Sequence, residues 1–406
     1  MKYDVVIAGG GLNGAALAIA LQRAGLLTCV IEAESATNHR QNGSDGRSYA
    51  IAAANQRMLE ALGLWDDLSE NAGPILDIKV TDGQVGRSIS PFFLHFDHSN
   101  VGDGPMGYMV EDRHLRGVLL DHLERSGVAH MAGKTVVSQQ VTPSGISVTT
   151  DTGKCISGRV LIGADGSQSG TAKRAGLKRV ASAYDQKALV CAVEHDHPHN
   201  GVAHQLFTPT GPIAILPLAG GHHSSIVWSE TIENAHAIQN MEDADYLNAL
   251  HQRIGSFLGD MRLFGNRYAY PLTLIMAHAM IADRVALIGD AAHTVHPIAG
   301  QGLNAGLKDV AALAEVLVQA HRLGLDIGSS VILEHYQTWR RFDVATLGMA
   351  TDGFNRLYSN NSSILRALRG VGMGLVARLP RLRDGFMREA MGATGDVPKL
   401  LKGISL

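Results

Sequence analysis

A cluster of glycines directly follows the first apolar run of the chain and restricts the folds that the chain can adopt. Tyr3 to Ala8 are predicted to form a buried strand, and Gly9-Gly10-Gly11-Leu12-Asn13-Gly14 comes directly after it. Ala15 to Arg23 have the composition of a helix, and Thr28 to Ile31 form a second short strand that ends at Glu32. A strand, a glycine-rich turn, a helix and a second strand that ends in an acid are the pattern of a Rossmann-like βαβ unit.

Each glycine of this turn has its own expected role. Gly9 permits the tight turn, Gly11 lets a diphosphate approach the backbone, and Gly14 lets the helix pack closely on the strand. The carboxylate of Glu32 follows at the spacing at which an acid meets a ribose hydroxyl. The alternative is a plain strand-to-helix turn, but strand, spacing, helix and acid together favour a dinucleotide site.

A second glycine-rich segment lies far along the chain. The apolar run Val285 to Ile288 suits a buried strand, and Gly289-Asp290 ends it where a carboxylate can accept hydrogen bonds from a ribityl chain. Gly300, Gly302 and Gly306 then let the backbone approach a flat ligand at a helix N-terminus. The partial positive charge of that terminus favours the negative charge of a reduced flavin. The two glycine-rich segments together predict an FAD site.

A third turn is expected in the middle of the chain. Val160 to Ile162 are predicted to form a short strand that ends in Gly163-Ala164-Asp165-Gly166. By itself this sequence is only a turn. Beside the other two segments, it would place the Asp165 carboxylate near the cofactor diphosphate, where it can order arginines or water.

Composition favours an ordinary enzyme of two or three domains. The chain has 406 residues, of which 45% are hydrophobic and 18% charged, and its net charge of -3 argues against nucleic acid as a partner. Three cysteines without CxxC pairing give no disulfide framework, and Cys29 and Cys191 lie in apolar runs typical of a core. The 19 histidines lack partners at ligand spacing, so no metal site is expected.

No export or membrane-spanning segment is expected. The glycine triplet interrupts the apolar N-terminus, which the Rossmann-like unit uses completely, so a signal peptide is rejected. No run of eighteen apolar residues occurs, because the best candidate, around Leu272 to Ile288, contains charged residues. The chain is therefore predicted to be cytoplasmic.

Periodicity gives a coarse order of elements between these motifs. Helices are predicted over Ile51–Leu62 and Val110–Arg125, and again over Leu303–Leu323 and Ile332–Leu357. Val136 to Thr150 read as a hairpin around Pro143-Ser144-Gly145. Alternation from Tyr184 to Trp228, with several prolines and glycines between the runs, predicts a second, mostly β domain.

The three motifs, in this order and at these intervals, make the chain resemble the single-component aromatic flavoprotein hydroxylases, the group that includes p-hydroxybenzoate hydroxylase. Within that group, His296 to Asn304 (HPIAGQGLN) is similar to the HPxxGQGxN signature of the ubiquinone-biosynthesis hydroxylases. Further segments are similar to family motifs: 45–51 (DGRSYAI), 184–195 (YDQ through VEH) and 354–360 (FNRLYSN). One motif departs from the family: DGxxSxxR ends in arginine, whereas this chain has Ala172 followed by Lys173. The nicotinamide or diphosphate role of that motif, and whether Lys173 replaces the arginine, stay open.

The resemblance implies an α/β fold in which a Rossmann-like FAD-binding domain of the p-hydroxybenzoate hydroxylase type is interleaved with a mostly β substrate domain. The FAD-binding domain would comprise residues 1–72, 108–178 and 273–350. The substrate domain would comprise residues 73–107 and 179–272, and a helical region would follow over residues 351–406.

The resemblance also implies where FAD lies. Adenosine would meet Glu32, pyrophosphate would lie on Gly11 to Gly14, and the ribityl chain would lie at Asp290. The isoalloxazine would lie against Pro297, Gly300, Gly302, Leu303 and Asn304. Arg47 and Arg113 would contact flavin or pyrophosphate; the alternative for Arg113 is an exposed ion pair beside Glu111 and Asp112.

The implied activity is hydroxylation of the aromatic ring of a polyprenylated phenol in ubiquinone biosynthesis, through reduced flavin, O2 and a C4a-hydroperoxide. NAD(P)H or a protein electron donor would reduce the flavin. His204, His222 and His223 are candidates for a base that deprotonates the phenol, but spacing selects none of them, so no catalytic residue is assigned. The alternatives are a non-catalytic FAD-binding subunit of a quinone-synthesis complex, or a flavin oxidase or hydroxylase for another aromatic substrate.

The C-terminal region suggests a membrane contact. Apolar residues recur at helical spacing from Leu365 to Met387, and the tail from Leu365 to Lys402 has eight cations and only three acids. Such a helix can lie on an anionic membrane and deliver a prenyl tail, or pack on the FAD-binding domain with its arginines in water. We therefore expect peripheral attachment at the inner face of a membrane, with other ubiquinone-biosynthesis proteins as partners.

Overall fold

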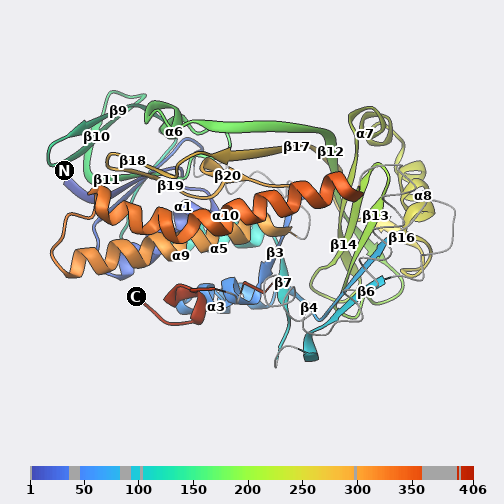
Figure 1. Ribbon diagram of the computed structural model, residues 1–406. Coiled ribbons are helices and arrows are strands. Elements are labelled where there is room, and N and C mark those ends of the chain that lie inside the picture. Colours follow the sequence, from blue (N-terminus) through green and yellow to red (C-terminus); the bar gives the residue numbers. More distant parts are fainter. Residues whose placement is uncertain are drawn as a thin grey trace.

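The computed structural model describes residues 2–35, 46–82, 93–100, 104–296, 300–358, 391–392 and 395–406. In this part of the chain, strands form three sheets of eight, nine and three strands. Figure 1 shows the first sheet at one end of the molecule and the second sheet at the other, with the long strands β12 and β17 running between them.

The first sheet has the order β18-β19-β11-β1-β2-β8, and the hairpin β9–β10 extends it from β11. Strand β1 runs parallel to both β2 and β11, and its residues Val5 to Ala8 are buried because helices and strands cover both faces. The strands are β1 (Lys2–Ala8), β2 (Thr28–Glu32), β8 (Ala129–Ala132), β9 (Val136–Thr142), β10 (Gly145–Thr150), β11 (Cys155–Gly163), β18 (Ile281–Ala282) and β19 (Val285–Leu287).

Helices cover this sheet and enclose the main core. Helix α9 is buried along most of its length and packs on both α1 and α10, which Figure 1 shows running beside it. The helices of this part are α1 (Leu12–Arg23), α3 (Ala53–Ala61), α4 (Asp66–Ser69), α5 (Asp112–Arg125), α6 (Gly170–Arg174), α9 (Gln301–Arg322) and α10 (Ser330–Tyr358), with the short 3-10 turns η2 (Gly289–Ala291) and η4 (Lys399–Lys402). The 3-10 turn η1 (His98–Asn100) directly follows β6 (Phe93–Asp97) of the second sheet.

The second sheet has the order β20-β17-β12-β15-β14-β13-β5-β6, with β16 beside β12. Helices α7 (Ile232–Gln239) and α8 (Asp243–Ile254) share a core with it around Trp228 and Tyr246. Its strands are β5 (Asp77–Asp82), β6 (Phe93–Asp97), β12 (Arg179–His195), β13 (Val202–Thr208), β14 (Gly211–Pro217), β15 (His223–Thr231), β16 (Met261–Leu263), β17 (Tyr268–Ala277) and β20 (His293–Thr294).

The third sheet is small and links the other two parts. It has the order β3-β7-β4, formed by β3 (Ser48–Ala52), β7 (Gly107–Glu111) and β4 (Ala72–Ile75). The chain therefore passes between the first and second sheets more than once, as the interleaved arrangement requires. The residue boundaries of the two predicted domains stay a prediction.

Most predicted elements are confirmed, with corrections at their ends. The βαβ unit and the hairpin around Pro143-Ser144 are present. The helix predicted from Ile51 begins only at Ala53, because Ile51 and Ala52 pair with β7 as part of β3. The helix predicted from Val110 begins at Asp112 for the same reason. The strand predicted at 160–162 is longer, since β11 pairs with β1 and β10 along its whole length.

Residues 395–406 pack back on α3, α9 and α10. Leu400 and Leu401 are buried, and Arg57 of α3 donates a hydrogen bond to the Leu401 carbonyl at 3.1 Å. The Trp339 indole of α10 donates to the Asp396 carbonyl at 2.7 Å. The segment predicted to contact a membrane, Leu365 to Met387, lies outside the described residues.

Candidate functional site

The first glycine turn has the close contacts that its sequence predicts. Gly9 has φ +101°, and a Cβ there would lie 2.3 Å from the Ala164 carbonyl oxygen. A Cβ on Gly14 would lie 2.0 Å from the Gly9 carbonyl oxygen. A Cβ on Gly11 would have no neighbour within 4 Å in the part of the chain that the structure describes. Gly9 and Gly14 are therefore required by the protein's own packing, whereas Gly11 borders open space at the N-terminus of α1, where no side chain caps the helix.

Glu32 lies beside this turn. One carboxylate oxygen accepts a hydrogen bond from the Gly10 amide and the other accepts from the Glu34 amide at 2.8 Å. The side chain stays partly exposed. The acid is thus fixed at the end of β2 next to the glycine turn, as the βαβ pattern predicts.

Asn13 joins the first turn to the later glycine-rich segment. A Cβ on Gly289 would lie 2.3 Å from its Nδ2, and a Cβ on Gly306 would lie 2.4 Å from the same atom. Its Oδ1 is buried without a hydrogen-bond partner among the described residues. Two segments separated by almost 300 residues are therefore in contact through one side chain, as a single cofactor site requires.

Asp290 lies in the turn η2, between buried neighbours. Its side chain is exposed, while Gly289 and Ala291 on either side are buried. Burial by the surrounding protein raises the pKa of its carboxyl, and the charges of His293 and Arg47 oppose that rise. A carboxylate that is both accessible and partly desolvated is recessed in the surface, a position suited to binding hydroxyl groups.

Only one of the three glycines near the start of α9 borders open space. Gly300 has φ +63°, and a Cβ there would lie 2.9 Å from the Ala50 Cβ, so it packs on β3. Gly306 packs on Asn13. A Cβ on Gly302 would meet none of the described residues within 4 Å. Protein packing therefore accounts for Gly300 and Gly306, and Gly302 is the position that the described residues leave open to a ligand. A cofactor contact at Gly300 or Gly302 stays a prediction.

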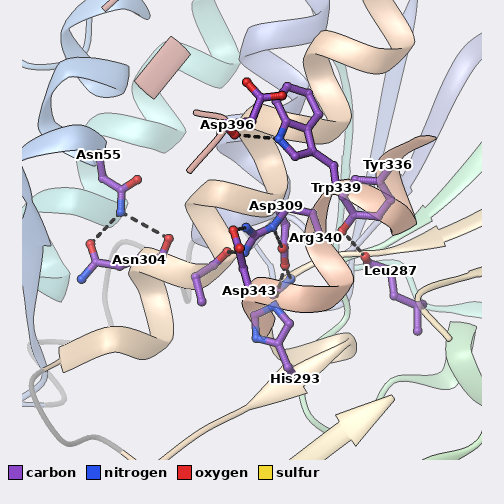
Figure 2. A network of polar contacts seen from close by, with 12 residues as sticks. Asn55, Leu287, His293, Asn304, Asp309, Tyr336, Trp339, Arg340, Asp343 and Asp396 are labelled. Carbon is purple, nitrogen blue, oxygen red and sulfur yellow. Dashed lines mark hydrogen bonds and ion pairs between the residues drawn. The ribbon is translucent and has the colours of Figure 1, made fainter. Parts of the chain in front are cut away.

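The side chain of Asn304 is used within the protein. Its Oδ1 accepts from the Ala52 amide at 2.9 Å and from Asn55 Nδ2 at 2.7 Å, and its Nδ2 donates to the Ala50 carbonyl at 2.7 Å. Figure 2 shows the pair with Asn55. Asn304 thus fixes the start of α9 against β3 and α3. A cofactor contact by Asn304 or by the buried Leu303 stays a prediction, and Pro297 lies outside the described residues.

The two predicted arginines occupy different surroundings. The Arg47 guanidinium lies 5.6 Å from the centre of the Tyr270 ring and close enough to Asp290 to act on its pKa. The Arg113 guanidinium is 46% exposed and forms an ion pair with Glu111 at 2.9 Å. The structure brings Arg47 to the candidate site and gives Arg113 the exposed ion pair that was its alternative.

The Asp165 carboxylate caps the helix that follows it. It accepts from the Ser169 hydroxyl, from the Thr171 amide at 2.9 Å and from the Thr171 hydroxyl at 2.8 Å. Arg179 donates to the Ser167 carbonyl at 2.9 Å and to the Ala291 carbonyl at 3.4 Å, and so joins this loop to η2. The third motif is therefore adjacent to the other two, and Asp165 supports its loop.

The family arginine missing at Ala172 is not replaced in place. Ala172 is fully buried in the short helix α6, and the adjacent Lys173 is exposed. Burial lowers the pKa of Arg174, and the charge of Asp165 opposes that change, which shows that Arg174 lies near the carboxylate. Arg174 and Arg179 are the cations that the structure places around this loop.

Sequence reasoning missed a buried charged cluster under η2. Asp309 of α9 contacts His293 at 2.6 Å and Arg340 of α10 at 2.8 Å, and all three side chains are almost inaccessible. The signal available in the sequence was Asp309 itself, an acid among the apolar residues of α9. A carboxylate is rarely buried without a partner, so its position indicated that a partner must exist.

His296 was also missed as a site residue. It is fully buried, its ring lies edge-on 5.1 Å from the Tyr184 ring, and neither nitrogen has a hydrogen-bond partner among the described residues. Burial lowers its pKa to about 4, so the imidazole is neutral at pH 7.

The three histidines considered as bases lie on or beside the second sheet. Burial lowers the pKa of His204 to about 4, and its ring packs 4.5 Å from Phe257. His222 contacts the His195 carbonyl at 3.0 Å, and the His223 ring lies 4.6 Å from Phe264. These contacts are within the second sheet and the segments beside it, and they select none of the three as a catalytic base.

The residues present fit FAD. The N-termini of α1 and α9 lack side-chain caps, and Gly11 and Gly302 border open space at these termini. Asp290, which lies between these glycines in the sequence, is accessible, and the buried Oδ1 of Asn13 has no hydrogen-bond partner among the described residues. Helix N-termini bind anions such as a diphosphate, and the exposed carboxylate binds hydroxyls, so the donor and acceptor set matches a flavin dinucleotide.

Comparison with known proteins agrees with this fit. A family model described as an FAD binding domain matches residues 2–347. Ubiquinone hydroxylase UbiL of Rhodospirillum rubrum is 42% identical over 99% of this chain and 93% of its own length. The chain belongs to the FAD-dependent ubiquinone hydroxylase family. The 3-demethoxyubiquinol 3-hydroxylase of Escherichia coli is 31% identical over 96% of this chain and 98% of its own length.

The solved structures support the fold. The p-nitrophenol 4-monooxygenase PnpA of Pseudomonas putida aligns with a TM-score of 0.79 at 20% identity, covering 97% of this chain and 99% of PnpA. The predicted fold class and the assignment as an FAD-dependent aromatic-ring monooxygenase are thereby confirmed. Among the described residues of this hydroxylase, no helix is long and apolar enough to span a membrane.

Proposed function

We propose that the chain hydroxylates the aromatic ring of a polyprenylated phenol in ubiquinone biosynthesis, with O2 as co-substrate. The observation that carries the flavin-dependent chemistry is the contact, through Asn13, between the glycine turn after β1 and the Gly289-Asp290 turn, which brings both halves of the expected FAD site together. The similarity to a ubiquinone hydroxylase over almost the whole chain supports the substrate class.

The protein's own groups are proposed to bind and orient the cofactor. Glu32 accepts hydrogen bonds from the ribose, Gly11 and the N-terminus of α1 bind the diphosphate, and Asp290 accepts from the ribityl hydroxyls. The N-terminus of α9 at Gly302 stabilises negative charge on the ring system. Arg47 lies near Asp290 and supplies a compensating positive charge.

When bound and reduced, FAD supplies the activation of dioxygen, which side chains cannot perform. NAD(P)H or a separate electron-transfer protein is the proposed reductant. The protein must exclude water from the reacting centre, and the aromatic and apolar side chains between the sheets, such as Tyr184 and Tyr270, are proposed to contribute to this exclusion.

Access of the substrate is proposed to involve a membrane surface. A polyprenyl chain partitions into lipid, and the sequence from Leu365 to Met387 combines apolar residues at helical spacing with arginines. The membrane contact is proposed from the sequence. The association with other ubiquinone-biosynthesis proteins is proposed on the same basis.

Two measurements test the proposal. A strain that lacks the gene should accumulate one under-hydroxylated quinone precursor, whereas an unchanged quinone pool removes the pathway assignment. With the purified protein, FAD, a reductant and 18O2, the label should enter the phenolic product. A protein that binds FAD but consumes oxygen without labelling the product is an oxidase, and one that binds FAD without turnover is a non-catalytic subunit.

A further inference from the structure

Asp309 uses both carboxylate oxygens inside the protein. One oxygen accepts a hydrogen bond from the Gly289 amide at 3.0 Å and lies 2.6 Å from His293 Nε2. The other accepts from Arg340 Nε at 2.8 Å. Figure 2 shows this carboxylate between His293 and Arg340. One side chain of α9 therefore contacts η2, β20 and α10.

The cluster is charged and closed to solvent. Asp309 is 0% exposed, His293 1% and Arg340 4%. Burial alone would raise the pKa of Asp309, but the charges of His293 and Arg340 outweigh it and hold this pKa below its ordinary value. The carboxylate is thus ionised, and Arg340 is balanced further by Asp343 at 2.7 Å. A buried ionised group of this kind is retained only when its partners hold a defined geometry.

The atoms that Asp309 holds flank Asp290. Gly289 immediately precedes Asp290 and His293 follows it by three residues, so one carboxylate fixes both ends of the segment 289–293. Asp290 itself stays exposed between these fixed ends. Because Asp309 belongs to α9, it also sets the position of η2 relative to the helix whose N-terminus carries Gly302.

We propose that Asp309 is a positioning residue for the cofactor: by holding the Gly289 amide and His293 from α9, it fixes the Asp290 turn relative to the N-terminus of α9. Cofactor retention then depends on a carboxylate that lies beneath the turn. The inference rests on the FAD-binding part of the proposed function and needs nothing from the identity of the substrate.

Asp309→Asn tests this directly, with Tyr336→Phe as the matched control. Asparagine removes the charge that holds His293 and Arg340. Tyr336 of α10 is also buried, and its hydroxyl donates to the Leu287 carbonyl at 2.8 Å, just before the turn, without contacting segment 289–293 in any described hydrogen bond. Both variants should lower the melting temperature of the apoprotein. The dissociation constant of FAD, measured by quenching of flavin fluorescence, should rise roughly tenfold for D309N, the size expected for losing one charged hydrogen bond, and change little for Y336F.

A second variant covers the case in which D309N does not fold. In D309N/R340Q the buried cluster loses one charge of each sign, so its charge balance is kept. This apoprotein should be more stable than D309N and should still bind FAD roughly tenfold more weakly than the wild type. Recovery of wild-type affinity in the double variant would mean that charge balance, and not the position of the turn, is what Asp309 provides.

A double-mutant cycle with Asp290→Asn separates positioning from general stability. If Asp309 acts through the Asp290 turn, D309N should weaken FAD binding much less in the D290N background than in the wild type. Additive effects, or D309N affinity equal to wild type, would overturn the inference. If the wild-type chain itself does not bind FAD, the proposed function fails, and that outcome is distinct from the failure of Asp309 as its positioning residue.

Discussion

The amide of Asn55 donates a hydrogen bond to the side-chain oxygen of Asn304 at 2.7 Å, although 249 residues separate them in the sequence. This contact, together with the Ala52 amide and the Ala50 carbonyl on the same Asn304 side chain, fixes the N-terminus of α9 to the third sheet and α3. The family signature that ends at Asn304 is thus partly a structural element, which positions the helix end at which the flavin is expected.

Asn304→Ala should destabilise the chain. The substitution removes the side-chain partner of the Ala52 amide and of the Ala50 carbonyl, and it leaves Asn55 only its longer bond to the Asn304 main-chain carbonyl at 3.3 Å. We expect a loss of about 2–3 kcal/mol in the free energy of unfolding. Urea denaturation of the apoprotein measures this loss. Gln56→Ala on the same helix α3 removes only the long, exposed contact with Glu60 at 3.4 Å, and it should change the free energy by less than about 0.5 kcal/mol. Equal effects of the two variants would show that the Asn304 contacts contribute no special stability.

The glycines should separate into two classes when each is changed to alanine. Gly11→Ala and Gly302→Ala place a methyl group in open space, so the apoprotein should keep its stability within about 1 kcal/mol. Their FAD affinity should fall at least about tenfold, because the added methyl lies where the cofactor approaches the backbone. Gly14→Ala collides with the Gly9 carbonyl and should destabilise the apoprotein itself by about 2–3 kcal/mol. Calorimetry of the apoproteins and FAD titration give both quantities; unchanged FAD affinity in G11A and G302A would remove both positions from the site.

The two arginines carried over from the family should differ in importance. Arg47→Ala removes a positive charge near Asp290 and should weaken FAD binding several-fold. Arg113→Ala breaks an exposed ion pair with Glu111 and should change stability by less than about 0.5 kcal/mol, with little effect on FAD. Flavin titration of the two apoproteins under the same salt conditions decides the order. A larger effect of R113A would support Arg113, and not Arg47, as the cofactor ligand.

The fold could be predicted where local pattern decides the structure. The buried strand of Tyr3 to Ala8, the glycine turn and the acid at Glu32 are a short-range signal, and the structure reproduces them. The predicted helix starts at Ile51 and Val110 were wrong. Both residues belong to strands, because β3 pairs with β7, and this pairing joins partners about 60 residues apart that local periodicity does not reveal.

The site was predictable as motifs but not as contacts. Sequence could place Gly11, Asp290 and Gly302 in a flavin site, yet it could not show that Gly300 packs on Ala50 or that Gly306 packs on Asn13. The Asp309, His293 and Arg340 cluster depends on the packing of α9 against α10, which no spacing rule encodes. The acid in the apolar run of α9 indicated only that some partner must exist.

Acid should destabilise the chain through His296. Burial lowers its folded-state pKa to about 4, below the ordinary value of 6.5, so the unfolded chain binds the proton more tightly. The contribution to stability is complete above pH 6.5 and is lost as pH falls toward 4, to a maximum of about 3 kcal/mol. The slope of melting temperature against pH between 6.5 and 4 should therefore be smaller in His296→Gln.

The control for this pH dependence is His335→Gln, because His335 is exposed on α10. The slope in H335Q should equal that of the wild type. Parallel slopes in H296Q and the wild type would mean that His296 does not titrate as a buried neutral group.

The flavin content of the purified 406-residue chain decides whether Gly11, Asp290 and Gly302 hold FAD. After the cofactor is stripped, the wild-type chain should take up stoichiometric FAD and regain the flavin absorbance. The folded D290N/G302A apoprotein should take up none under the same conditions. A wild-type chain that stays colourless in excess FAD, or a doubly substituted chain that binds FAD as the wild type does, would contradict the site described above.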